Sequence, residues 1–521
     1  MNMPTNPPKI FGLSASLRNA RSEEGALRLL EQLTSLPDEA ALNEYLRSEA
    51  RSYLDEFQAG RTARQPFDEL YARIKKAGGL KGLSNSEVCL AAALWGAVSE
   101  GAEIDFQSLS VYFPASGGPR NLEDLKARIE AADAILLATP VYFGDRSSVS
   151  QMFIDLLRND AEMRRAVEGK VYAGLAVGAK RNGGQETTLI YQMLDLLNLG
   201  MLAVGNDSVT TSQYGGTGHA GDIGQMADDR EGLKTCLGTG RRVVRVAKIL
   251  LAAGKCELKD DLSVGLWELQ DDRQGTLASV ARAAARPAPA NTRFVFTEFS
   301  AESIRPCNAC DICPVRVGAD EEYRCLVRGE EDAMRKMHVG MLAADVIVPA
   351  LYSPRDRSGL RSVYQQFMER TRYLRRGDYV FTDRLVIPFV LSDVGVNDSM
   401  HMRLITSFIR HHTVMCRPLV GLVHEGKLLN EDELRQDFAL AVEQGRRLLR
   451  GRLYLAMKDP KATEYNPVGY ILSSEKKIEE ERMAQRQEVT QLRLQRFSQI
   501  SMRRLGMSPQ QSPSGHEEDG I

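Results

Sequence analysis

The chain has 521 residues, which at about 150 residues per domain indicates more than one domain. Its 67 lysines and arginines nearly balance 69 aspartates and glutamates, and a net charge of -2 excludes the strong basic field of a nucleic-acid or membrane-surface binder. No apolar run approaches the roughly 20 residues of a membrane-spanning helix, and the first residues lack the features of a signal peptide. We therefore expect a cytoplasmic protein without nucleic-acid or membrane partners.

Short apolar runs alternate with amphipathic helical stretches along both halves of the chain. Such alternation is typical of an α/β fold with a parallel sheet. The strands expected in the first half are 9–16, 102–111, 133–142, 171–178 and 200–207, and those in the second half are 262–269, 292–299, 344–352, 384–393 and 418–426. Five strands in each half predict two doubly wound parallel sheets.

The two halves resemble each other weakly in sequence. Residues 131–158 and 343–370 both read Ala-Ala-Asp, a buried strand, a Tyr-bearing loop rich in Ser and Arg, and a helix with a Phe. We interpret this as a tandem duplication, although two unrelated α/β halves would share some of these features.

The expected domain boundaries follow from this repeat. Residues 1–255 form the first domain, with a helical insertion at about 20–82, and residues 256–456 form the second. Residues 457–521 read as a charged helical tail with a disordered end, more typical of a solvated segment than of a docking arm.

The first strand ends in a small-residue turn that is suited to an anion. Ser14 and Ser16 stand at the end of the strand and Arg18 comes just after it, and backbone N–H groups in such a turn can bind a phosphate beside a helix N-terminus. The expected helix begins only after the insertion, near Ser84 and Asn85. We therefore predict an anion site split by the insertion, while ordinary turn and cap residues are the alternative.

Three further motifs make a family resemblance explicit. The sequences GLSASLR, TPVYFGDRSSVSQMFIDLLR, GAKRNGGQETTL and QYGGTG resemble those of the flavodoxin-like NAD(P)H-dependent FMN reductases, including the iron-sulfur flavoproteins. The resemblance spans most of residues 8–240 and, more loosely, 260–455.

The resemblance implies two groups of FMN-binding residues. The phosphate would lie at Ser14, Ser16, Arg18, Ser84, Asn85 and Ser86. The isoalloxazine ring would lie between two loops made of Thr139, Pro140, Val141, Tyr142, Phe143 and Gly144, and of Gly183, Gly184 and Gln185. Independently of the family, these loops follow strands, where open α/β sheets bind ligands.

The second half departs from the family pattern at its first loop. Asp271 and Asp272 stand where a phosphate-binding Ser/Arg loop would be, and two carboxylates repel a phosphate. We therefore expect one FMN per chain, in the first domain.

Four of the eight cysteines are clustered in the second half. Cys307, Cys310 and Cys313 have C-x-x-C-x-x-C spacing, and Cys325 follows after eleven intervening residues. Thiolates favour soft metals, and the doubled C-x-x-C step with Pro314 favours a [4Fe-4S] cluster. Structural zinc and metal-free thiols are the alternatives, and the long last spacer departs from the usual pattern of iron-sulfur flavoproteins.

Together these sites predict an NAD(P)H-dependent FMN reductase-like oxidoreductase without a catalytic acid or base. FMN in the first domain would take electrons from NAD(P)H or a protein donor, and an iron-sulfur cluster in the second would pass them singly to an unknown acceptor. The alternatives are a non-catalytic scaffold or regulatory subunit with structural zinc, and a quinone or nitro-compound reductase without a cluster. A homo-oligomer is one state that the resemblance allows. His411 and His412 are expected at a helix end on the surface.

Overall fold

The computed structural model describes residues 6–16, 18–59, 82–114, 118–207, 209–210, 212–270, 275–286, 290–299, 304–313, 316–356, 362–463 and 476–507. Asp271, Asp272 and Pro314 lie outside these ranges, as does the end of the chain after residue 507. Within them, no helix is long and apolar enough to cross a membrane.

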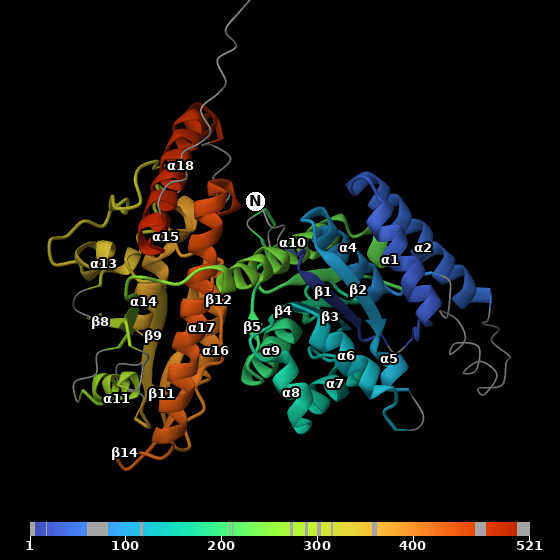
Figure 1. The fold of residues 1–521 in the computed structure, drawn as a ribbon, viewed down its shortest axis with the longest axis horizontal. Coiled ribbons are helices and arrows are strands. Elements are labelled where there is room, and N and C mark those ends of the chain that lie inside the picture. Colours follow the sequence, from blue (N-terminus) through green and yellow to red (C-terminus); the bar gives the residue numbers. More distant parts are fainter. Residues whose placement is uncertain are drawn as a thin grey trace, which may run out of the picture.

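The first half is a parallel sheet with helices on both faces (Figure 1). Its elements are β1 (Lys9–Ser14), α1 (Glu23–Ser35), α2 (Glu39–Ala59), α4 (Asn85–Ser99), β2 (Glu103–Ser108), α5 (Leu109–Tyr112), α6 (Leu122–Ala131), β3 (Ala134–Pro140), α7 (Ser148–Asn159), α8 (Ala161–Val167), β4 (Val171–Gly178), α9 (Gln185–Asn198), β5 (Leu202–Ala203), β6 (Gly216–His219), η1 (Gln225–Asp228), α10 (Arg230–Ala252) and η2 (Ala253–Lys255). The strand order is β2-β1-β3-β4, and both β5 and β6 then pair with β4 in parallel. This is the doubly wound order 2-1-3-4-5.

The second half repeats this strand order. Its elements are β7 (Leu262–Glu268), α11 (Thr276–Ala285), β8 (Thr292–Glu298), α12 (Ala333–Lys336), α13 (His338–Leu342), β9 (Val346–Ser353), α14 (Ser362–Arg370), α15 (Arg372–Asp378), β10 (Leu385–Val386), β11 (Phe389–Asp393), α16 (Met400–Phe408), η3 (Ile409–His411), β12 (Val414–Met415), β13 (Leu419–His424), β14 (Lys427–Leu428), α17 (Glu431–Lys458), η4 (Pro460–Thr463) and α18 (Lys476–Arg504). The order is β8-β7-β9, followed by β10 and β11, and then by β12 and β13.

The described strands form one sheet of 14 strands rather than two separate sheets of five. The expected strand 384–393 is divided in the structure into β10 and β11, while β6 and β12 lie outside every expected strand. Met415 in β12 pairs antiparallel with Ala203 in β5, and this contact joins the two halves.

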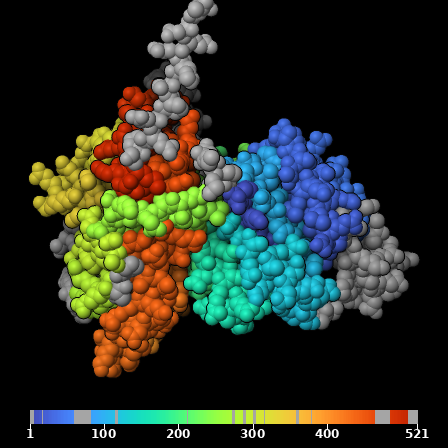
Figure 2. Space-filling view, viewed as in Figure 1, coloured from blue at the N-terminus to red at the C-terminus, as the bar shows by residue number. Residues whose placement is uncertain are grey.

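Side chains alternate between two hydrophobic cores, one on each face of the sheet. In β1, Ile10 lies in one core, while Phe11 and Leu13 lie in the other. Each core contains residues of both halves, so the halves are packed as one body (Figure 2). This alternation follows from the two-residue period of a strand covered by helices on both faces.

The C-terminal helix α18 lies against the second half (Figure 1). Its buried side chains recur every three or four residues, at Arg486, Thr490, Leu494, Ser498, Ser501 and Leu505 just beyond its end. The expectation of a solvated tail was wrong for this helix, because most of its buried stripe is polar and carries little hydrophobic periodicity.

The two adjacent histidines are also buried rather than on the surface. His411 lies between Phe381 and Phe408, and its Nε2 is 3.2 Å from the Thr371 hydroxyl. His412 Nδ1 is 3.0 Å from the carbonyl oxygen of Asn206. The helix end that carries them faces the first half of the chain, which the local sequence could not indicate.

Candidate functional site

The phosphate-type loop follows the first strand at the carboxyl edge of the sheet. Ser14 is fully buried at the end of β1, and the next residue, Ala15, donates its N–H to the carbonyl oxygen of Ala138 at 2.8 Å. Ser16 is also buried, and its Oγ accepts a hydrogen bond from the N–H of Arg18 at 3.3 Å. The loop therefore leaves β1 in a tight turn that is held to the end of the neighbouring strand β3.

A buried polar network holds this loop against the start of α4, across the insertion. The carboxylate of Glu87 accepts hydrogen bonds from Arg21 Nε at 3.1 Å, from the N–H of Ser84 at 2.9 Å and from the Asn19 amide. Arg21 also donates to the carbonyl oxygen of Gly82. Glu87 is fully buried and Arg21 nearly so, so this ion pair connects the segments before and after the insertion.

One cavity of about 260 Å³ lies at this edge of the sheet. Its lining comes from both sides of the insertion, from the loops after β3 and β4, and from the segment after β6. The lining residues are Ser16, Arg18, Tyr53, Ser84, Asn85, Ser86, Pro140, Val141, Tyr142, Val177, Gly178, Ala179, Ala220, Gly221, Asp222 and Ile223. The structure thus brings together eight of the residues named from the sequence.

The phosphate end of this cavity has donors suited to an anion. The Oγ of Ser84 lines the cavity, is buried and has no hydrogen-bond partner among the described residues. The Oγ of Ser14 is likewise buried without a partner there, but Ser14 lies behind the lining rather than in it. Ser84 is the N-cap of α4, whose first N–H groups and helix dipole favour negative charge. Arg18 adds a guanidinium that lies 5.7 Å from the centre of the Phe57 ring. These groups fit a phosphate.

The loop after β3 forms the other end. Val141 donates its N–H to the carbonyl oxygen of Val177 at 2.9 Å, while Tyr142 and Asp145 exchange two backbone hydrogen bonds. Phe143 and Gly144 both have positive φ, which makes this turn tight. Tyr142 lines the cavity and is partly exposed, whereas Phe143 is fully exposed and is not part of the lining.

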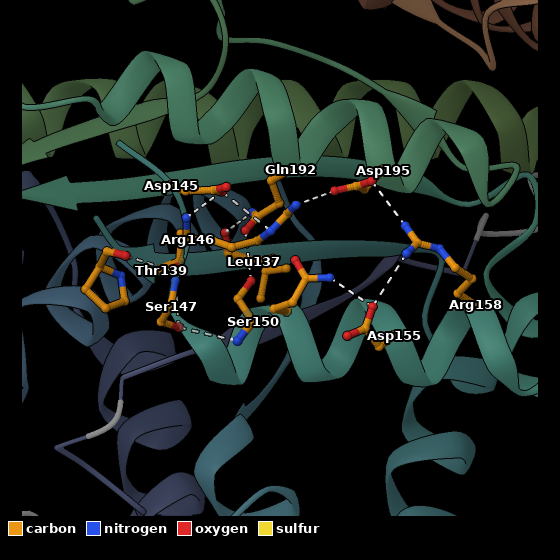
Figure 3. A network of polar contacts seen from close by, with 12 residues as sticks. Leu137, Thr139, Asp145, Arg146, Ser147, Ser150, Asp155, Arg158, Gln192 and Asp195 are labelled. Atoms are coloured by element: carbon orange, nitrogen blue, oxygen red, sulfur yellow. Dashed lines mark hydrogen bonds and ion pairs between the residues drawn. The ribbon is translucent and has the colours of Figure 1, made fainter. Parts of the chain in front are cut away.

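Thr139 and the residues after the turn hold this loop (Figure 3). Thr139 is buried and accepts the N–H of Ser147 at 3.0 Å, so it shapes the loop without lining the cavity. Arg146 forms an ion pair with Asp195 of α9, and Asp195 also pairs with Arg158 at 3.2 Å. The loop is therefore attached to the helix that follows the next strand.

Gly183, Gly184 and Gln185 also lie beside the cavity rather than in its lining. A Cβ on Gly184 would lie 2.7 Å from Gly144 Cα, and Gly184 has φ of 103°, so only glycine allows the two loops to touch. The Gln185 amide donates to the carbonyl oxygens of Lys180 at 2.7 Å and Gly218 at 3.0 Å. Gln185 therefore links this loop to β6.

The sequence did not identify two walls of the cavity. Tyr53 comes from α2 in the insertion, and burial raises the pKa of its hydroxyl. Asp222 follows β6, and its carbonyl oxygen accepts a hydrogen bond from the Asn85 amide at 3.1 Å. The Asn85 side-chain oxygen in turn accepts the N–H of Gly224 at 3.1 Å. The motif QYGGTG was the only signal for the second wall.

The four clustered cysteines lie in the second half, between β8 and α12. Cys313 and Cys325 are buried, and Cys310 is exposed. Cys307 Sγ accepts the N–H of Ala309 at 3.4 Å. Burial, with the charges of the three other thiols, raises the pKa of Cys313 to about 11. Among the residues that the structure describes, no three Cys, His, Asp or Glu side chains converge in a metal-binding arrangement.

Comparisons with known proteins match the first half of the chain. A model of the NADPH-dependent FMN reductase family matches residues 77–216. An iron-sulfur flavoprotein of Methanocaldococcus jannaschii is 37% identical over 133 residues, which cover 25% of this chain and 66% of that protein. An iron-sulfur flavoprotein of Methanosarcina thermophila is 30% identical over 136 residues, which cover 25% of this chain and 64% of that protein.

The match to these two proteins covers just under two thirds of their lengths. A longer match is to an NAD(P)H dehydrogenase (quinone) of Methylocella silvestris, 31% identical over 171 residues, which cover 29% of this chain and 85% of that protein. With this similarity, the chain belongs to the flavodoxin-like NAD(P)H-dependent FMN reductase family of oxidoreductases.

Proposed function

We propose that the chain is a flavin-dependent oxidoreductase that binds one FMN in the cavity of its first half and accepts electrons from NAD(P)H. The observation that carries this proposal is that Ser16, Arg18 and the start of α4 line the same cavity as the loop of Tyr142. Anion donors at one end and an aromatic side chain at the other match a phosphate and a ring system.

Each group of residues has a separate role in this proposal. Ser14, Ser16, Ser84 and Arg18 hold the phosphate together with the first N–H groups of α4. The Tyr142 loop and Gly178 border the ring and limit the access of water. Bound FMN supplies acceptance of a hydride and release of electrons one or two at a time. The chain's own residues bind and orient, and none of them is assigned as a catalytic acid or base.

The test is FMN binding by the full-length protein, followed by NAD(P)H oxidation. We expect about one FMN per chain, and an affinity at least tenfold lower in Arg18→Met, because charge-assisted hydrogen bonds contribute about 1.5 to 3 kcal/mol. Arg51→Met is the matched control, since Arg51 is exposed on α2 and does not line the cavity. Absence of FMN binding by the wild-type protein would favour the scaffold alternative.

We infer, second, that the two halves are tandem copies of one flavodoxin-like unit, at 1–255 and 256–456. Their equal strand order supports this inference. The first loop of the second half, residues 271–274, lies outside the described residues. The same FMN measurement tests the number of sites, since two FMN per chain would contradict a single site in the first half.

The cysteine cluster is proposed as an iron-sulfur site, with zinc as the alternative. Four neighbouring thiols are a chemically suitable donor set, and two relatives are named iron-sulfur flavoproteins. Because the described thiols do not converge, no electron-transfer step is derived through a cluster. The iron and zinc contents of one anaerobically purified sample distinguish the two metals. About four irons per chain would support the cluster, and zinc would support a structural site.

The acceptor is a separate question. A relative is named NAD(P)H dehydrogenase (quinone), so reduction of a quinone is the first reaction to assay. Obligatory two-electron turnover would favour a quinone or nitro-compound reductase without a cluster, and delivery to one-electron acceptors would favour a relay.

A further inference from the structure

A second cavity lies in the other half of the molecule, about 150 Å³ in volume. It is bordered by α17, by α18 and by the segment that connects α15 to β10. The lining residues are Asp320, Tyr379, Val380, Thr382, Asp383, Arg384, Arg452, Thr463, Thr490, Arg493, Leu494 and Phe497. At about 30 Å³ per water molecule, this is room for roughly five waters.

Two arginines in this lining are in contact with no carboxylate of the part of the chain that the structure describes. Arg452 is 9% exposed, and its Nη1 donates to the carbonyl oxygen of Thr382 at 3.3 Å. Arg384 donates through Nη1 to the carbonyl oxygen of Ala344 at 2.6 Å. The Nε atoms of both arginines are buried without a hydrogen-bond partner among the described residues. A guanidinium in this position retains unused donors, and its charge is offset only by carboxylates that are not in contact with it.

The acidic residues of the lining are engaged with other arginines. Asp383 pairs with Arg242 and, at 2.9 Å, with Arg245. Asp320 accepts two hydrogen bonds at 2.8 Å from Arg493. The positive charge of the cavity is therefore not balanced by its own carboxylates.

The electrostatics of the two arginines agree with this excess of positive charge. Burial and, next to it, the charge of Arg452 lower the pKa of Arg384 to about 9. Burial also lowers the pKa of Arg452, while the charges of Asp345 and Asp383 act in the opposite direction. Those two carboxylates pair with Arg504 and Arg242. An anion between the two guanidinium groups would relieve both the desolvation and the mutual repulsion.

We propose that this cavity binds a phosphate group, held by Arg384 and Arg452. The planar fork of a guanidinium matches the oxygens of a phosphate. The Thr490 side chain of α18 also lines the cavity, whereas the Thr382 hydroxyl already donates to the carbonyl oxygen of Tyr379 at 2.7 Å. The Phe497 ring lies 5.2 Å from the Arg452 guanidinium and covers it from α18. The site is in the second half, apart from the FMN cavity, and does not depend on the proposed function.

The experiment is a calorimetric titration of the full-length protein with inorganic phosphate and with glycerol 3-phosphate. Prior addition of FMN blocks the first cavity if the proposed function is right, and the two lining variants assign the binding event to the second cavity whether or not FMN binds. We expect one binding event in the wild-type protein and at least a tenfold loss of affinity in Arg452→Met. Arg435→Met is the matched control, because Arg435 is on the same helix, pairs with Glu431 on the surface and does not line the cavity.

A second variant, Arg384→Met, keeps the test valid if Arg452→Met does not fold. Without phosphate, we expect both variants to have thermal midpoints at least as high as that of the wild-type protein, because each removes an uncompensated buried charge. Tighter binding of glycerol 3-phosphate supports a phosphate ester as the natural ligand, and tighter binding of inorganic phosphate supports the free ion. No binding by the wild-type protein, or unchanged affinity in both variants, overturns the proposal.

Discussion

At the scale of single residues, Glu87 connects the loop after β1 to the start of α4, the two segments proposed to bind phosphate. Its buried carboxylate accepts hydrogen bonds from Arg21, Asn19 and the N–H of Ser84. We predict that Glu87→Gln destabilises the protein by about 3 to 5 kcal/mol, because it leaves the Arg21 charge buried without a partner. It should also weaken FMN binding, since both sides of the loop move. Urea unfolding and FMN titration measure the two effects.

The control for Glu87 is Glu39→Gln, an exposed carboxylate in the first turn of α2. A double variant, Glu87→Gln with Arg21→Met, separates charge from packing: it should recover part of the lost stability, because neither charge is then left alone. Equal unfolding midpoints for Glu87→Gln and Glu39→Gln would show that the network does not hold the loop.

At the scale of elements, the contact between α4 and α10 positions α4, whose N-terminus borders the cavity proposed for FMN. A Cβ on Gly240 would lie 1.9 Å from the carbonyl oxygen of Ala93, so the two backbones touch. We predict that Gly240→Ala forces the helices apart and destabilises the protein by at least about 1 to 3 kcal/mol, the usual cost of overpacking. It should also reduce the affinity for FMN. Thermal unfolding with and without FMN measures both.

The matched control for this contact is Gly254→Ala, just beyond the end of α10, where a Cβ would meet nothing within 4 Å. It should leave stability and FMN affinity close to those of the wild-type protein. A Gly240→Ala protein as stable as Gly254→Ala would mean that the helices can separate without cost.

At the scale of the whole molecule, α10 connects the two halves. Its Arg242 and Arg245 pair with buried Asp383 of the second half, and Arg242 also donates to the carbonyl oxygen of His412 at 2.6 Å. Burial raises the pKa of Asp383, but the charges and hydrogen bonds of Arg245 and Arg242 lower it further, to about 2. The charged carboxylate therefore stabilises the fold above the unfolded value of about 3.9, and this contribution is lost as pH falls through about 2.

We predict that Asp383→Asn lowers stability by about 3 to 5 kcal/mol at neutral pH, because two arginines lose a buried partner. It should also reduce the loss of stability that the wild-type protein shows between about pH 4 and pH 2. Unfolding midpoints across that range measure the effect, with exposed Asp432→Asn on α17 as the control. The same acid dependence in Asp383→Asn would contradict the assignment.

Much of the fold and part of the site were accessible from the sequence. The apolar runs and their order predicted the α/β class, because short buried runs that alternate with amphipathic helical stretches can be recognised from local sequence. Small polar residues after β1 and a Tyr-bearing loop after β3 predicted one edge of the sheet for the same reason. Tyr53 and Asp222 were missed, since they reach the cavity only through packing of α2 and of the segment after β6.

The sequence by itself determined which elements form, their chain order and the residue types at the carboxyl edge of the sheet, since these follow from local periodicity and turn chemistry. Only the tertiary structure decided how distant segments meet. It joined the halves into one described sheet through Met415 and Ala203, buried His411 and His412, and placed the polar stripe of α18 against the second half. Such contacts depend on shape and charge across long separations in sequence, which no local pattern records.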